Sequence, residues 1–221
     1  VLLDFRGKVQ PSHSNSTIEE VFRPLLDKAI DRWEALPGHV QRTRAVFTDG
    51  STFFPLTPFK RSGYSLHFPL DDGEEELQLD ATPASVNGPL PDKHQDINRA
   101  ELFAVMKLMV SVTNFNVQWY SDSTYAIDGI KRLLQSPIKD VFAGRSNDDM
   151  WAVAEEILQQ FKRFFTIDCR YVPSHIERDE VGSEFLSVGV HTGRCISLSE
   201  FHGNKAADEA AKTGARKHLD F

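Results

Sequence analysis

The sequence of 221 residues contains two cysteines, no run of eighteen uncharged apolar residues, and fewer basic than acidic side chains. Cys169 and Cys195 are too few for a disulfide framework and fit a reducing compartment, so we expect an intracellular protein of the cytoplasm or nucleus. No membrane helix is predicted, and the opening VLLDF is too short and lacks the basic flank of a signal peptide. Because the sequence starts at Val1 rather than Met, we expect a piece of a longer polypeptide.

The shortage of basic residues gives a net charge of -7, which argues against a nonspecific nucleic-acid binder, since phosphate contacts come from Lys and Arg. Acidic residues gathered at a metal site would lower the total in the same way. The apolar fraction of 40% is enough for a real core, and the length suits one domain with an extension.

A helix is predicted near the N-terminus, after an irregular polar segment at 1–15. It begins with a capping box, in which Ser16 or Thr17 is paired with Glu19 or Glu20, and it ends before Gly38. We expect Pro24 to bend this helix or to delay its start. Its apolar stripe should dock on the domain that follows, and it comprises Val21, Phe22, Leu25, Leu26, Ala29, Ile30 and Trp33.

The rest of the chain predicts an α/β fold, a mixed five-stranded sheet flanked by helices. Three consecutive antiparallel strands are expected first, at 44–54, 60–68 and 74–82. Alternating elements follow: helix 98–112, strand 115–121, helices 123–135 and 147–165, strand 166–172 and helix 204–219. We therefore divide the chain into an N-terminal extension at 1–42 and one domain at 43–221.

Four carboxylates stand at predicted element boundaries, and each has an ordinary alternative role. Asp49 lies near the end of the first strand but is followed by Gly, a strong turn signal. Glu101 lies three residues after Asn98, the spacing of a helix cap with its reciprocating Glu. Asp122 follows a strand and could cap the next helix, as could Ser121. Asp208 lies in the first turns of the last predicted helix, where the helix dipole favours an anion.

Taken together, the four carboxylates predict a metal site. Two of them end neighbouring strands and two begin helices, and the order of elements brings these ends to one edge of the domain. Mg²⁺ prefers oxygen ligands, and two such ions can bind the attacking water and the leaving oxygen of a phosphodiester. Without cations, crowded like charges would raise the pKa values of these carboxylates.

Four motifs, "TDGS", "HQDINRAEL", "YSDSTY" and "GNKAAD" in that order, resemble ribonuclease H of the cellular type 1 and retroelement class, over residues 44 to about 218. The resemblance implies a metal-dependent endonuclease that hydrolyses the RNA strand of RNA/DNA hybrids, leaving 3′-hydroxyl and 5′-phosphate ends. It implies Asp49, Glu101, Asp122 and Asp208 as catalytic ligands of two Mg²⁺ ions, for which Mn²⁺ substitutes. As a retroelement domain, the chain would have the reverse transcriptase part of the same polyprotein as a partner.

The resemblance also implies further site residues. His175, in "YVPSH", is the candidate for proton shuttling or product release, although an ordinary loop histidine is the alternative. Substrate-binding candidates are Gly50, Ser51, Thr52, Asn98, Arg99, Ser123 and Asn204, of which the first four are expected at the minor groove, where the 2′-hydroxyl marks RNA.

The chain departs from the family pattern at three places. Asp96 and Ile97 replace the Thr-Asn that often precedes the Arg-x-Glu motif, and only Lys139 and Arg145 stand where many cellular members carry a basic protrusion. Hybrid binding is therefore expected to be weak. A long insertion near 176–202 has no derived role, and a zinc site at His191, Cys195 and His202 fits no common structural spacing.

A second hypothesis is a noncatalytic ribonuclease H-like scaffold or nucleic-acid-binding module. Retention of all four carboxylates favours the enzyme, because a scaffold gains nothing from packed like charges. An integrase fits less well, given the spacing from Glu101 to Asp122 and the terminal Asn-x-x-Ala-Asp motif.

Overall fold

The computed structural model describes residues 2–3, 9–10, 17–38, 42–54, 56, 60–69, 84–92, 94–136, 142–174 and 196–219. A five-stranded sheet in the order β5-β4-β3-β6-β7 forms its centre. The strands are β3 (Thr43–Phe53), β4 (Arg61–Phe68), β5 (Ala84–Pro89), β6 (Asn116–Ser121) and β7 (Ile167–Tyr171). β4 pairs antiparallel with β3 and β5, whereas β6 pairs parallel with β3 and β7. The predicted mixed sheet is confirmed.

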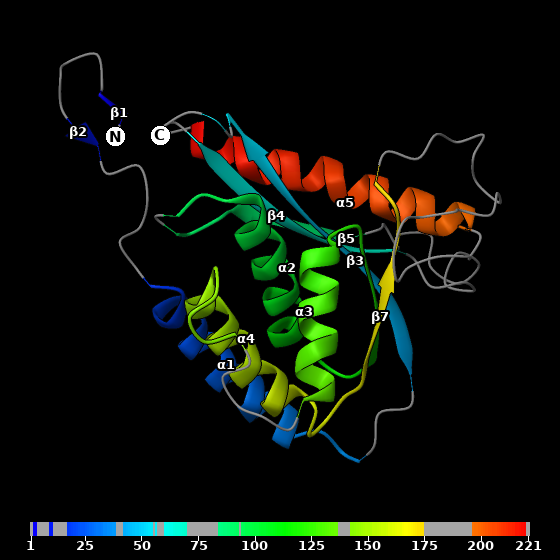
Figure 1. Cartoon of the computed structure of the whole chain (residues 1–221). Coiled ribbons are helices and arrows are strands. Elements are labelled where there is room, and N and C mark those ends of the chain that lie inside the picture. The colour runs from blue at the N-terminus through cyan, green and yellow to red at the C-terminus, as the bar shows by residue number, and fades with distance from the viewer. Residues whose placement is uncertain are drawn as a thin grey trace.

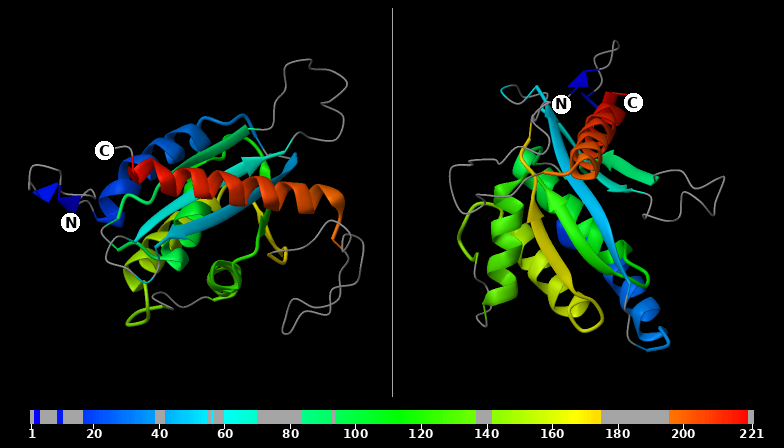
Figure 2. Two further views of the ribbon diagram at one scale, coloured as in Figure 1. Left: turned by 90° about the horizontal axis from the view of Figure 1, so that it is seen from above. Right: turned by 90° about the vertical axis from the view of Figure 1, so that its right-hand side faces the viewer.

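The helices lie on both faces of the sheet. They are α1 (Ile18–Glu34), α2 (Ile97–Ser111), α3 (Thr124–Gln135), α4 (Asp148–Phe161) and α5 (Leu198–Arg216), with a short 3₁₀ helix at Lys217–Leu219. α5 crosses one face, over β3, β4 and β5, while α1, α2, α3 and α4 lie on the other (Figures 1 and 2). Among the described helices, none is both long and apolar enough to cross a membrane.

Two details of the strands differ from the sequence-based expectation. The third strand of the antiparallel set is β5, which begins at Ala84, and the predicted strand at 74–82 lies outside the described residues. Near the N-terminus, expected to be irregular, β1 (Leu2–Leu3) and β2 (Val9–Gln10) form a small antiparallel pair.

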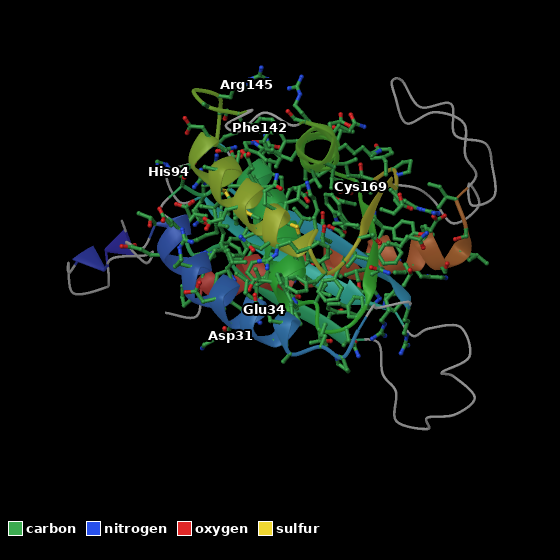
Figure 3. All side chains as sticks on the ribbon, turned by 90° about the horizontal axis from the view of Figure 1, so that it is seen from below. Asp31, Glu34, His94, Phe142, Arg145 and Cys169 are labelled. Atoms are coloured by element: carbon green, nitrogen blue, oxygen red, sulfur yellow. The ribbon has the colours of Figure 1, made fainter. Side chains whose placement is uncertain are left out.

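The predicted N-terminal helix is present and packs as expected. Thr17 caps α1 in a capping box with Glu20, and Pro24 is accommodated inside the helix without delaying its start. α1 packs against α4 and α2, and its buried residues Phe22 and Trp33 belong to the main core (Figure 3 shows Asp31 and Glu34 at its outer surface). The Trp33 indole donates a 2.8 Å hydrogen bond to the Val112 carbonyl at the end of α2.

We expect a chain that begins at Gln41, and so lacks α1, to melt at a lower temperature or to aggregate. Each large apolar side chain of the stripe contributes roughly 1.5–3 kcal/mol when buried, and removing α1 exposes the surfaces of α2 and α4 that it covers. Differential scanning calorimetry of the two chains checks this. An unchanged melting temperature would contradict the packing of α1 seen here.

Close backbone contact fixes α5 on the sheet. A Cβ atom at Gly63 of β4 would collide with the backbone of Gly214 and Ala215 in α5. Because Ala215 lies seven residues, two helical turns, from Asp208, this contact also fixes the position of Asp208 relative to the sheet.

Candidate metal centre

Asp49 lies within β3 rather than at a turn. Its neighbour Gly50 also continues the strand, and the two residues pair with Ser65 and Tyr64 of β4. The hairpin alternative for Asp-Gly is therefore wrong. Gly50 is required because a Cβ atom here would lie 2.7 Å from the backbone nitrogen of Glu101. The absence of a side chain lets the first turns of α2 approach β3 and brings Glu101 beside Asp49.

The capping alternatives for Glu101 and Asp122 are also wrong. The N-cap of α2 is Asp96, whose side chain accepts a hydrogen bond from the Asn98 amide, so Glu101 is not part of a capping box. The N-cap of α3 is Ser123, whose hydroxyl accepts from the Ala126 amide. Neither acidic side chain therefore caps its helix.

Asp208 comes from the opposite face of the sheet. α5 begins at Leu198, with Ser197 and Glu200 forming a capping box, so Asp208 lies in the middle of the helix. The helix-dipole explanation for its charge, which applies only to the first turn, therefore fails. The Asp208 carboxylate accepts a 2.6 Å hydrogen bond from Lys212, one turn further along.

Three of the four predicted ligands converge closely. Asp49, Glu101 and Asp122 each offer an oxygen atom, and these atoms lie within 4.8 Å of one another. Asp208 lines the same cleft and contributes electrostatically at Asp49, but it is not among these three. The structure thus brings one tight acidic trio together with a fourth carboxylate, from α5, in the same cleft.

The trio is unfavourable as a set of bare charges. Burial, followed by the negative charges of Asp122 and Asp208, raises the pKa of Asp49 to about 8. Burial and the charge of Asp49 raise the pKa of Glu101 well above its usual value. Both side chains are only 5% exposed, and the buried Oε2 of Glu101 has no hydrogen-bond partner among the described residues. Such an arrangement suits a divalent cation.

The trio lies in a cleft of about 750 Å³. Of the predicted substrate-binding residues, four line it: Gly50, Asn98, Ser123 and Asn204. Ser51 and Thr52 do not, and the Thr52 hydroxyl is instead 2.8 Å from that of Ser62.

Arg99 has a different environment from that expected of a substrate contact. It is 4% exposed and lies outside the cleft lining. Its guanidinium group pairs with Asp92 and, at 2.8 Å from each carboxylate oxygen, with Asp149 at the start of α4. These bonds raise the pKa of Arg99 and lower that of Asp149, so Arg99 joins α2 to α4.

Several predicted residues lie outside the described part of the chain, namely His175, His191 and Cys195. His202 is described, and it lines the cleft together with Phe201 and Lys205 of α5. No sequence motif predicts that these three residues line the cleft. The signal that could have found them is the capping box of Ser197 and Glu200, which starts α5 two turns earlier than the motif around Asp208 indicates.

We expect Gly50→Ala to weaken divalent-metal binding and cleavage together. The added methyl group must push the α2 backbone away from β3, and a displacement of about 1 Å at a reacting site costs on the order of 10²-fold in rate. Titration of Mg²⁺ against the melting temperature checks the metal affinity. A variant with wild-type Mg²⁺ affinity would show that α2 shifts without moving Glu101.

Comparison with known proteins gives one family and a consistent set of folds. The family model described as RNase H matches residues 41–216. A foamy viral protease-reverse transcriptase solved with an RNA/DNA hybrid has a TM-score of 0.51 at 17% identity, over 83% of this chain and 22% of that chain. LC9-RNase H1, described as a type 1 RNase H with the type 2 active-site motif, has a TM-score of 0.50 at 17% identity. The match covers 83% of this chain and 76% of that chain.

The native prototype foamy virus protease-reverse transcriptase gives a TM-score of 0.52 at 18% identity, over 82% of this chain and 22% of that one. This chain therefore spans about a fifth of the length of the foamy virus proteins. At these identities the likeness establishes the fold. The search of curated proteins returned no match.

Proposed function

The chain belongs to the ribonuclease H family, and from this premise we propose that it is a metal-dependent endonuclease that hydrolyses the RNA strand of RNA/DNA hybrids. The observation that carries the proposal is the convergence of Asp49, Glu101 and Asp122 within 4.8 Å at the floor of an open cleft. A scaffold would have no use for two buried carboxylates and a half-buried third that repel one another at such close range.

The residues present fit a site for divalent metal. We propose that the trio holds Mg²⁺, with Mn²⁺ as a substitute, and that Asp208 completes a second site from the α5 wall. The unpartnered Oε2 of Glu101 and the raised pKa of Asp49 both support this assignment, because a cation would supply the missing partner and relieve the repulsion. When bound, a pair of such ions generates the nucleophile and stabilises the leaving oxygen.

The protein itself contributes position and charge. β3 and β6 pair in parallel, so they position Asp49 within β3 and Asp122 directly after β6, and Gly50 sets the distance to Glu101. Asn98, Ser123 and Asn204 surround the trio with amide and hydroxyl groups suited to sugar and phosphate oxygens. We propose that they orient the substrate strand, with Gly50 and Asn98 at the minor groove. His175 remains the proposed proton shuttle.

The likeness to the fold of foamy virus reverse transcriptases, one of them solved with an RNA/DNA hybrid, supports both the hybrid substrate and a retroelement setting. We propose that the chain is the ribonuclease H part of a longer retroelement polyprotein and works beside a reverse transcriptase. Weak binding of hybrid by the isolated domain would agree with such an arrangement.

We expect the protein to cut RNA/DNA hybrid in the presence of Mg²⁺ and to leave double-stranded DNA intact, because only the 2′-hydroxyl marks one strand as RNA. Incubation with labelled hybrid, double-stranded RNA and double-stranded DNA, each with Mg²⁺ or EDTA, tests this. Binding of hybrid without cleavage would favour a noncatalytic module, and cutting of double-stranded DNA would indicate a different nuclease.

A further inference from the structure

The first turns of α5 line the cleft, as do Ser123, Thr124 and Tyr125 at the start of α3. Phe201, Lys205 and Asp208 follow one another at intervals of four and three residues, so they lie on the same face of the helix. All three line the cleft, as does His202. An acidic metal-binding position and a cationic position therefore share one wall.

We propose that Lys205 binds a backbone phosphate of the strand that is cut, and so positions that strand across the acidic trio. The inference rests on the proposed function and adds to it a phosphate contact on α5. Lys205 is a positioning residue in this scheme, and the acidic residues perform the chemistry.

The charge of Lys205 is available for such a contact. Within the described residues Lys205 makes no ion pair, and it is exposed to the cleft. Lys212, the next lysine on the helix, is instead held by Asp208. A cleft whose floor carries three carboxylates repels phosphates, so an unpaired cation on its wall provides attraction where the substrate must enter.

The spacing also suits a neighbouring phosphate. Lys205 lies three residues, about 4.5 Å along the helix axis, from Asp208. The long lysine side chain can therefore reach a phosphate next to the one at the metals. On the same helix, the half-buried Phe201 ring packs against the His202 ring. Asn204, which precedes Lys205 in the sequence, also lines the cleft. Its buried Oδ1 atom has no hydrogen-bond partner among the described residues.

The test measures binding in the Asp49→Asn background, where the hybrid is not consumed. Fluorescence anisotropy with a labelled RNA/DNA hybrid is recorded in Mg²⁺ between about 25 and 200 mM salt. Lys205→Ala should weaken binding about fivefold and reduce the slope of log K against log salt by about 0.7–0.9, the value for one phosphate contact. Lys205→Arg should restore most of both. Lys28→Ala, on the exposed face of α1, removes the same charge and should change neither.

Two results overturn the proposal in distinguishable ways. If the parent binds hybrid and Lys205→Ala behaves like Lys28→Ala, the contact is absent and the proposed function stands. If the parent binds no hybrid and the wild-type chain cuts none, both fail. Cleavage by the wild-type chain adds a second readout, since loss of a positioning contact to the substrate should raise KM more than it lowers kcat.

Discussion

Cleavage of RNA/DNA hybrid should be abolished by Asp49→Asn, while the metal-free protein becomes more stable. The substitution replaces an anionic oxygen at the centre of the trio by a neutral amide of nearly the same shape, so metal affinity is lost and packing is preserved. Stability should rise because the neutral amide needs neither to take up a proton on folding nor to carry a buried charge that Asp122 and Asp208 repel, as Asp49 does. The gain should be about 1–3 kcal/mol near neutral pH, or roughly 3–8 °C in melting temperature.

The same reasoning gives a pH dependence. The unfolded chain releases the Asp49 proton near its ordinary pKa of 3.8, and the folded chain releases it at about 8. The stability contributed by the protonated form is therefore complete below about pH 4 and is lost progressively as pH rises to about 8. Metal-free wild-type protein should lose stability over this interval more steeply than Asp49→Asn, and Mg²⁺ should remove the difference in slope by restabilising the ionised wild type.

These expectations are checked by melting curves of both proteins between pH 5 and 9, recorded with EDTA or with Mg²⁺. A hybrid cleavage assay completes the test. Glu209→Gln, an exposed acidic residue of α5, serves as the charge-matched control. Wild-type cleavage by Asp49→Asn would remove Asp49 from the site, and a destabilised variant would show that the carboxyl makes a stabilising contact in its neutral form.

Arg99→Ala should be among the most destabilising single substitutions in the chain. It leaves the buried carboxylate of Asp92 without its cation and breaks the link from α2 to Asp149 of α4. Removing one partner of a buried ion pair typically costs about 3–5 kcal/mol. Arg99→Lys should recover only part of this, because a single ammonium group cannot reproduce the forked contacts to two carboxylates.

Urea denaturation of Arg99→Ala compared with Arg163→Ala, an exposed arginine near Glu34, measures the effect. The KM for hybrid, measured on the folded fraction of Arg99→Ala, distinguishes a structural role of Arg99 from a contact with the substrate. An unchanged free energy of unfolding with a much higher KM would restore Arg99 as a substrate-binding residue.

The sequence predicted the order of elements and the approach of Asp49, Glu101 and Asp122 to one another, but it could not decide among local roles. Ser121, Asp122 and Ser123 are all good helix caps, and which one serves depends on the backbone angles at the end of β6. Asp96 displaced Asn98 at α2 for the same reason. Local capping rules apply equally to adjacent short polar residues, so only the folded backbone selects one.

Other misses came from tertiary contacts. The local sequence Asp49-Gly50 favours a turn, yet both residues pair with β4 within a strand. The glycine is explained instead by the close approach of α2 to β3. Arg99 belonged to a matched family motif, and nothing in its sequence neighbourhood shows that Asp92 and Asp149 enclose it. The capping box of Ser197 and Glu200 indicates where α5 starts. That start was missed because it lies within the insertion, where no family motif helps to predict a helix.

The four carboxylates are carried by β3, α2, the residue after β6, and α5, so no hairpin or helix pair contains the metal centre. Opening any of these elements disperses the ligands. Metal binding should therefore raise the free energy of every opening that separates the ligands, by RT ln(1 + [Mg²⁺]/Kd). In hydrogen exchange, Mg²⁺ should slow amides of β3, β6, α2 and α5 by a common factor, although only a few of these residues touch the ion. The assembly of the sheet and the loading of the site become a single cooperative event.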